Sequence, residues 1–129
     1  MTIDSHVHFW NFDAVRDSWI TDDMKILRRN FLPEHLSILL KENEMAGCVA
    51  VQADRSETET DFLARLSETN PFIKGVVGWV DLQDEHIGQR LEYFSRFPVI
   101  KGWRHIVQAE PDDFLAGNKF KRGIRALAA

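Results

Sequence analysis

Residues 3–8 read Ile3-Asp4-Ser5-His6-Val7-His8, and their conformation governs the interpretation of everything that follows. Side chains two apart in a β-strand point to the same face, so a strand here places His6 and His8 together and turns Val7 away. Two imidazoles so arranged can bind one divalent metal ion, or place two proton-transfer groups over one pocket. We therefore predict a first strand over residues 2–8, with both histidines facing one site.

Strand and helix patterns alternate along the rest of the chain. Apolar runs and helical spacings predict strands at 47–53, 73–80 and 99–107, and helices at 33–45, 56–70, 84–97 and from about 120 onward. A short turn or helical piece is expected at 112–118. The residues between 9 and 32 form a long polar and aromatic loop, of a length typical of lids and binding segments. Such βα alternation implies parallel strands joined by right-handed crossovers, with helices packed outside the sheet.

Local signals mark the ends of two of these helices. Pro33 stands where its missing N–H costs nothing, at the start of the first helix, and Gly47 is expected to end that helix. Ser56 and Glu59 form a capping-box pattern, in which Ser56 caps the second helix and the Glu59 side chain reaches back to the Ser56 backbone. The first pattern predicts where the first helix begins and ends, and the second predicts where the second helix begins.

Composition indicates one globular domain over residues 1–129. Hydrophobic residues make up 44% and charged residues 28% of the chain, and the net charge is −4, so neither a nucleic-acid interface nor disorder is indicated. No apolar run is long enough to span a membrane, and the N-terminus lacks a secretory signal pattern. The single cysteine, Cys48, lies in an apolar run and is expected to be buried and unreactive, which fits a cytoplasmic location.

Four βα units correspond to half of an eight-stranded (β/α)8 barrel. The last predicted helix runs to Leu127-Ala128-Ala129 without a cap or a polar tail. A four-stranded parallel sheet also leaves two open edges, which a complete barrel closes. The expected fold is therefore α/β, the N-terminal half of a TIM-like barrel with outer helices.

Several motifs, in chain order, resemble the amidohydrolase superfamily (amidohydrolase-related family 2). The resemblance is closest to the lactonase branch, whose members include L-fuconolactonase, L-rhamnonolactonase and 2-pyrone-4,6-dicarboxylate lactonase. The motifs are Asp4-Ser5-His6-Val7-His8-Phe9-Trp10, Val51-Gln52-Ala53 with Glu59-Thr60, Gly75-Val76-Val77-Gly78-Trp79-Val80-Asp81-Leu82, Lys101-Gly102-Trp103-Arg104-His105 and Gln108-Ala109-Glu110-Pro111. One departure is Trp103, where the family has a small apolar residue.

The resemblance implies hydrolysis of a sugar-acid lactone or a related cyclic ester, at the C-terminal ends of the barrel strands. His6, His8, Arg104 and His105 are the candidate catalytic residues. By alternation, only one of Arg104 and His105 can face the barrel interior. An arginine there could bind a carboxylate or hydroxyls bidentately, whereas the alternatives are a surface ion pair for Arg104 and a satisfied hydrogen bond for His105.

Candidate substrate-binding residues are Gln52, Trp10 and Trp79. Gln52 could bind a sugar hydroxyl or satisfy a loop, and the tryptophans could stack on a sugar ring or simply pack in the core. His6 and His8 are candidate ligands of one divalent metal, zinc. Metal-free operation, in which they bind the lactone carbonyl or a substrate carboxylate, is an open alternative, because two imidazoles do not complete a tetrahedral zinc site.

The family's catalytic aspartate lies at the end of strand eight, and a further histidine lies at the end of strand six. Four predicted strands offer no counterpart to either residue, so the 129-residue chain is expected to be inactive alone and to need a missing C-terminal half. Two alternatives remain open. The half-barrel could form its site only as a homo-oligomer, or the chain could be an inert binding module or truncated product.

Overall fold

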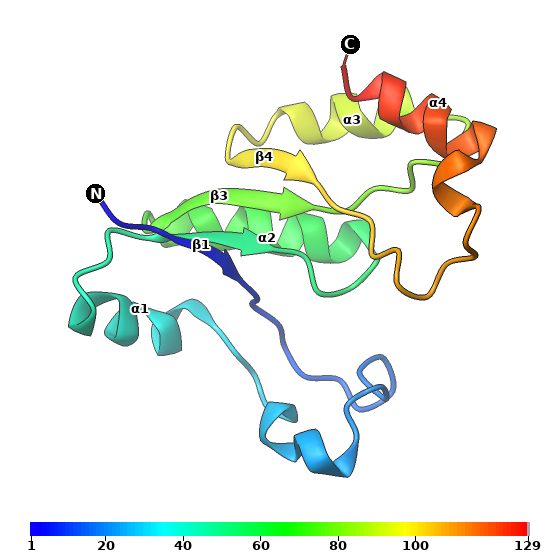
Figure 1. Cartoon of the computed structure of the whole chain (residues 1–129). Coiled ribbons are helices and arrows are strands. Elements are labelled where there is room, and N and C mark those ends of the chain that lie inside the picture. The colour runs from blue at the N-terminus through cyan, green and yellow to red at the C-terminus, as the bar shows by residue number, and fades with distance from the viewer. Residues whose placement is uncertain (129) are drawn as a thin grey trace.

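The computed structural model describes residues 1–128, in which a four-stranded parallel sheet carries its helices on one face (Figure 1). The sheet order is β1-β2-β3-β4 and all three pairings are parallel. The strands are β1 (Asp4–Val7), β2 (Cys48–Val51), β3 (Ile73–Gly78) and β4 (Ile100–Trp103). All four arrows therefore point the same way, and the carboxyl ends of the strands meet at one edge. The predicted alternation of parallel strands and helices is confirmed.

Each predicted helix is present; the first three are shorter than expected, and the fourth begins about two residues earlier than expected. The helices are α1 (Pro33–Glu42), α2 (Glu57–Thr69), α3 (Ile87–Ser95) and α4 (Asn118–Ala126), with short 3-10 segments η1 (Asp22–Leu27) and η2 (Phe114–Ala116). The short piece expected at 112–118 corresponds to η2. Within the long segment before α1, a β-bridge joins Trp10 to Phe31 and folds the segment back on itself.

The prediction that Gly47 ends the first helix is wrong. Helix α1 ends at Glu42, where the side-chain amide of Asn43 donates to the Leu39 carbonyl and caps the last turn. Gly47 instead lies where β2 begins, and a Cβ atom there would come within 2.2 Å of the Phe72 carbonyl oxygen. Glycine is needed at this position because the chain passes so close to the start of β3.

Apolar side chains on one face of the sheet pack against the helices. Val76 and Ala50 from the strands meet Leu40 of α1 and Leu63 of α2 in one buried cluster. A second cluster joins α3, α4 and the segment after β3, and contains Val80, Leu82, Ile87, Phe94 and Phe120. The opposite face of the sheet is more open, because Val49 and Val77 are half-buried and Lys101 is exposed. The helix-covered face therefore holds the core, and the other face is left for the site.

Cys48 is buried within the first of these clusters, as the sequence predicted. Burial raises the pKa of its thiol to about 11, so the thiol stays protonated at neutral pH. Among residues 1–128, no helix is both long and apolar enough to cross a membrane.

We predict that Leu63→Ala lowers the free energy of unfolding by about 2–5 kcal/mol, because Leu63 is 0% exposed and its removal leaves a cavity between α2 and the sheet. Leu39→Ala on α1 is the control, since Leu39 is 54% exposed and its loss costs at most about 0.5 kcal/mol. Urea unfolding followed by circular dichroism measures both. Equal losses for the two variants would contradict this assignment of the core.

Candidate functional site

The two histidines lie side by side at the carboxyl end of β1. Val7 packs into the core, so the alternation of the strand turns His6 and His8 toward the open face. Their ring centroids are 4.9 Å apart and the rings are nearly perpendicular. His6 is exposed and His8 is half-buried. The predicted juxtaposition of these two imidazoles is confirmed.

A hydrogen bond to the end of β2 fixes the ring of His8. Its Nδ1 atom lies 2.8 Å from the Val51 carbonyl oxygen. A carbonyl oxygen can only accept, so Nδ1 carries the proton and donates. In the neutral ring, the lone pair is therefore on Nε2.

The surroundings of His8 favour that neutral form. The pKa of His8 is lowered from its ordinary value of 6.5, chiefly because burial disfavours the charged ring. The positive charges of His6 and Arg104 lower it further, while the hydrogen bond to Val51 acts in the opposite direction. His8 consequently offers an unprotonated nitrogen at neutral pH.

Arg104 directly follows β4, which ends at Trp103 and not at the predicted residue 107. Its backbone N–H donates to the Gly78 carbonyl and continues the pairing of β3 with β4 by one residue. Its guanidinium Nη1 donates to the Gln52 carbonyl oxygen at 3.0 Å, and Gln52 Nε2 donates to the Arg104 carbonyl oxygen at 3.2 Å. These reciprocal bonds place a cation at the carboxyl ends of β2 and β4, close enough to act on His8.

Gln52 is 0% exposed and links the ends of β2 and β4. Its Oε1 atom is buried and has no hydrogen-bond partner within the part of the chain that the structure describes. The structure thus gives Gln52 a positioning contact with Arg104 and leaves one acceptor unused.

His105 lies apart from the histidine pair. Its ring stacks on Phe114 with centroids 4.7 Å apart, and Nε2 donates to Glu110 Oε1 at 2.9 Å. Only 8% of its side chain is exposed. Of the two neighbours, Arg104 is the one beside Gln52 and His8, so we leave His105 out of the proposed site.

The candidate tryptophans also lie elsewhere. The ring of Trp79 is beside His105, with centroids 6.4 Å apart, and the ring of Trp10 packs on Phe31 at 4.5 Å. Trp10 lines a cavity of about 440 Å³ together with Arg16 and Glu59. The structure therefore brings together His6, His8, Gln52 and Arg104, and separates Trp10, Trp79 and His105 into other contacts.

The donor set fits part of a metal site. His6 and His8 supply two imidazoles from one face, and the contact of His8 with Val51 orients its ring as outer partners orient metal-bound histidines. In residues 1–128, however, no group of three or more His, Cys, Asp or Glu side chains is placed to hold a metal ion. The chain offers two ligands, and the remaining ones would have to come from water, substrate or another segment.

One contact near the site differs from the sequence prediction. Ser56 caps α2 as expected, because its hydroxyl accepts from the Glu59 backbone N–H at 3.2 Å. The Glu59 side chain does not return to Ser56, as the capping-box pattern predicted. Its Oε2 atom accepts from the backbone N–H groups of Ala53 and Asp54, at 3.0 and 2.7 Å. The only sequence signal for this contact was a glutamate in the first turn of a helix that begins soon after the end of a strand.

Four parallel strands with a histidine pair at their carboxyl ends are typical of the class of (β/α)8-barrel enzymes. The chain matches the family model described as Amidohydrolase over residues 3–129 and belongs to that family. It is 36% identical over 131 residues to L-fucono-1,5-lactonase from Burkholderia multivorans, a match that covers 100% of this chain and 44% of that protein. It is 30% identical over 111 residues to L-fucono-1,5-lactonase from Burkholderia ambifaria, covering 86% of this chain and 38% of that protein.

Solved structures support the same assignment. The chain superposes with a TM-score of 0.94 and 36% identity on a crystal structure of an amidohydrolase from Burkholderia multivorans with bound zinc. The match covers 98% of this chain and 45% of that one. The predicted fold class, an N-terminal portion of an amidohydrolase barrel, is confirmed, and the chain spans less than half the length of the relatives it matches.

We predict that His8 titrates below 6.5, and that Arg104→Gln moves its midpoint upward, because removing the cation eases protonation. Burial remains in the variant, so the midpoint stays below the ordinary value. Because the pKa is lower in the folded than in the unfolded chain, the fold loses stability as the pH falls from about 6.5 toward the folded-state pKa. Proton NMR titration of the imidazole signals measures the midpoint. Arg125→Gln on α4 is the charge-matched control, and a midpoint unmoved by Arg104→Gln would contradict the proximity of the two groups.

Proposed function

We propose that this chain supplies the substrate-polarising part of the active site of a hydrolase that opens a sugar-acid lactone or a related cyclic ester. The observation that carries the proposal is the convergence of His6, His8 and Arg104 at the carboxyl ends of the strands. Barrel enzymes place their active sites at this edge. The names of the two Burkholderia relatives point to the lactone as the class of substrate.

In the proposed reaction, water adds to the lactone carbonyl carbon and the ring C–O bond breaks, giving a hydroxy acid. A base takes a proton from the water, and the ring oxygen gains one. Arg104 would hold the substrate through its guanidinium, whose remaining N–H groups suit a carboxylate or a pair of hydroxyls. Among the described residues, no carboxylate hydrogen-bonds to the ring of His6 or of His8. We therefore propose that the general base comes from a segment outside the described residues.

The tautomer of His8 favours metal binding over the metal-free alternative. With Nδ1–H donating to Val51, neutral His8 presents Nε2 as an acceptor, which suits a metal ion and cannot donate to a lactone carbonyl. His6 and His8 would hold the ion, and zinc is the proposed one. When bound, such an ion supplies Lewis-acid polarisation of the carbonyl or activation of water. The buried, unpaired Cys48 agrees with a cytoplasmic setting for the enzyme.

We predict that the metal-free chain binds one zinc ion, and that His6→Ala or His8→Ala weakens binding by a factor on the order of 10–100 or more, because each removes one of two ligands. Isothermal titration calorimetry, with an excess of chelator as the reversal, measures the affinity. His86→Ala is the control, because His86 is exposed at the start of α3. Equal affinity in the His6 and His8 variants would exclude this pair as the ligands.

We predict no hydrolysis of L-fucono-1,5-lactone by the chain alone above the uncatalysed rate, since the proposed base lies elsewhere. Mixing the chain with the segment of the Burkholderia multivorans relative that its match leaves uncovered should give turnover, measured by proton release. His8→Ala should abolish that turnover, and His86→Ala should leave it unchanged. Turnover by the chain alone, together with a dimer in light scattering, would favour the homo-oligomeric alternative. A complex that forms and never hydrolyses lactones would count against the lactonase proposal.

A further inference from the structure

Residues 51–54, which are the last residue of β2 and the three residues after it, are here called the β2 exit. The site contacts this segment on two of its carbonyl groups. Val51 accepts from His8 and Gln52 accepts from Arg104. The positions of these two carbonyl oxygens therefore set where the His8 ring and the Arg104 guanidinium lie.

Glu59 holds the other half of the β2 exit. It lies in the first turn of α2, and its Oε2 atom accepts from the N–H groups of Ala53 and Asp54. The Gln52 N–H still pairs with the Val77 carbonyl of β3. Beyond that point, within residues 1–128, Glu59 is the only acceptor these two backbone amides have. The carboxylate thus replaces the missing strand partner just where the sheet pairing ends.

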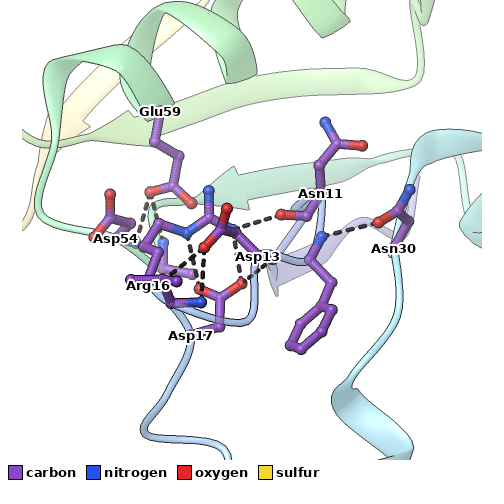
Figure 2. A network of polar contacts seen from close by, with 10 residues as sticks. Asn11, Asp13, Arg16, Asp17, Asn30, Asp54 and Glu59 are labelled. Carbon is purple, nitrogen blue, oxygen red and sulfur yellow. Dashed lines mark hydrogen bonds and ion pairs between the residues drawn. The ribbon is translucent and has the colours of Figure 1, made fainter.

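The surroundings of Glu59 are mixed in charge (Figure 2). Asp54 comes from the β2 exit, while Arg16, Asp13 and Asp17 come from the segment after β1, where Arg16 forms an ion pair with Asp17 at 2.7 Å. The pKa of Glu59 is raised to about 7, chiefly by burial and also by the charge of Asp54, while the two N–H bonds and Arg16 act in the opposite direction. A carboxylate accepts such bonds more strongly than a carboxylic acid does. The two hydrogen bonds that Glu59 accepts from the β2 exit are consequently expected to weaken as Glu59 gains its proton.

We propose that Glu59 is a positioning residue that acts through the β2 exit, holding the Val51 and Gln52 carbonyls at the places where they orient His8 and Arg104. Calling these two groups a site depends on the function proposed above, whereas the chain of contacts from Glu59 to His8 does not. Glu59 makes no contact with either imidazole. Its influence therefore passes through the backbone.

The test uses the metal-free 129-residue chain, labelled for NMR, with Glu59→Gln and Glu59→Ala. Glu59→Gln keeps an acceptor oxygen and loses the titratable charge, and Glu59→Ala loses both. Glu68→Gln is the matched control, because Glu68 is an exposed carboxylate on the same helix. Asp54→Asn separates the titration of Glu59 from that of its charged neighbour.

Two readouts are expected to move. In the unsubstituted chain, the amide signals of Ala53 and Asp54 should shift with a midpoint of about 7. This transition should survive in Asp54→Asn, at a lower midpoint, and vanish in Glu59→Gln. At one fixed alkaline pH, nitrogen signals of the His8 ring should show the Nδ1–H tautomer dominant. Its population should fall in Glu59→Ala toward that of exposed His86, be partly restored in Glu59→Gln, and stay unchanged in Glu68→Gln.

A purely structural role would lower thermal stability and leave the His8 tautomer as it is, and that result would overturn the proposal. So would an amide transition that persists in Glu59→Gln. If Glu59→Ala fails to fold, the near-isosteric Glu59→Gln carries both readouts. None of these signals depends on zinc or on lactone. A chain that binds neither, yet shows both shifts, would refute the proposed function and leave the positioning role standing.

Discussion

The parallel pairing of β1 with β2 is the constraint on which the site depends. Asp4 lies opposite Cys48 and Val7 lies opposite Ala50, so the next residue on each strand, His8 and Val51, come together where the pairing ends. The hydrogen bond between the His8 ring and the Val51 carbonyl continues that pairing with a side chain in place of backbone. A shift of one residue in this register would turn both histidines into the apolar core, where burial of two imidazoles without partners is costly.

Buried polar contacts hold the strand ends together. Backbone pairing within the sheet stops at Gln52 and Arg104, and beyond these residues side chains supply the partners that backbone groups need. Arg104 and Gln52 satisfy one another across β2 and β4, and Glu59 satisfies two amides of the β2 exit. Because each bond lies in a half-buried setting, losing one partner leaves a polar group exposed to little water, at a cost of about 1–3 kcal/mol. The edge that holds the candidate site is thus also the edge whose geometry depends most on side-chain hydrogen bonds.

The sequence was a good guide to the fold because periodicity reflects burial directly. The two-residue alternation of β1 and the helical spacing of Leu36, Leu39 and Leu40 each predicted the element that the structure contains, although Leu39 itself is 54% exposed. The juxtaposition of His6 and His8 followed from the same alternation. Element ends were less accurate: Gly47 was expected to stop α1, but the reason for glycine there is the approach of Phe72, which lies on a distant segment.

The contacts between elements were beyond the reach of sequence patterns. Alternation predicted that Arg104 and His105 face opposite ways, but which of them meets Gln52 depends on packing against Phe114 and the rest of the second cluster. The capping pattern located Glu59 in the first turn of α2, yet its carboxylate bonds to Ala53 and Asp54, because the β2 exit brings two unpaired N–H groups within reach. Sequence patterns describe one helix or strand at a time, whereas each of these contacts joins residues from two different segments.

The electrostatics of the site make a consistent argument about its chemistry. His8 is kept neutral chiefly by burial and also by the positive charge of Arg104, which both lower its pKa, and its proton is donated to Val51. A neutral imidazole with Nε2 free is a ligand or a proton acceptor, and it is a poor donor to a carbonyl oxygen. Arg104 supplies the fixed positive charge that an anionic or hydroxyl-rich substrate requires. The described residues therefore present an unprotonated imidazole nitrogen beside a fixed positive charge, and under the proposed function the further metal ligands and the base would lie opposite this edge.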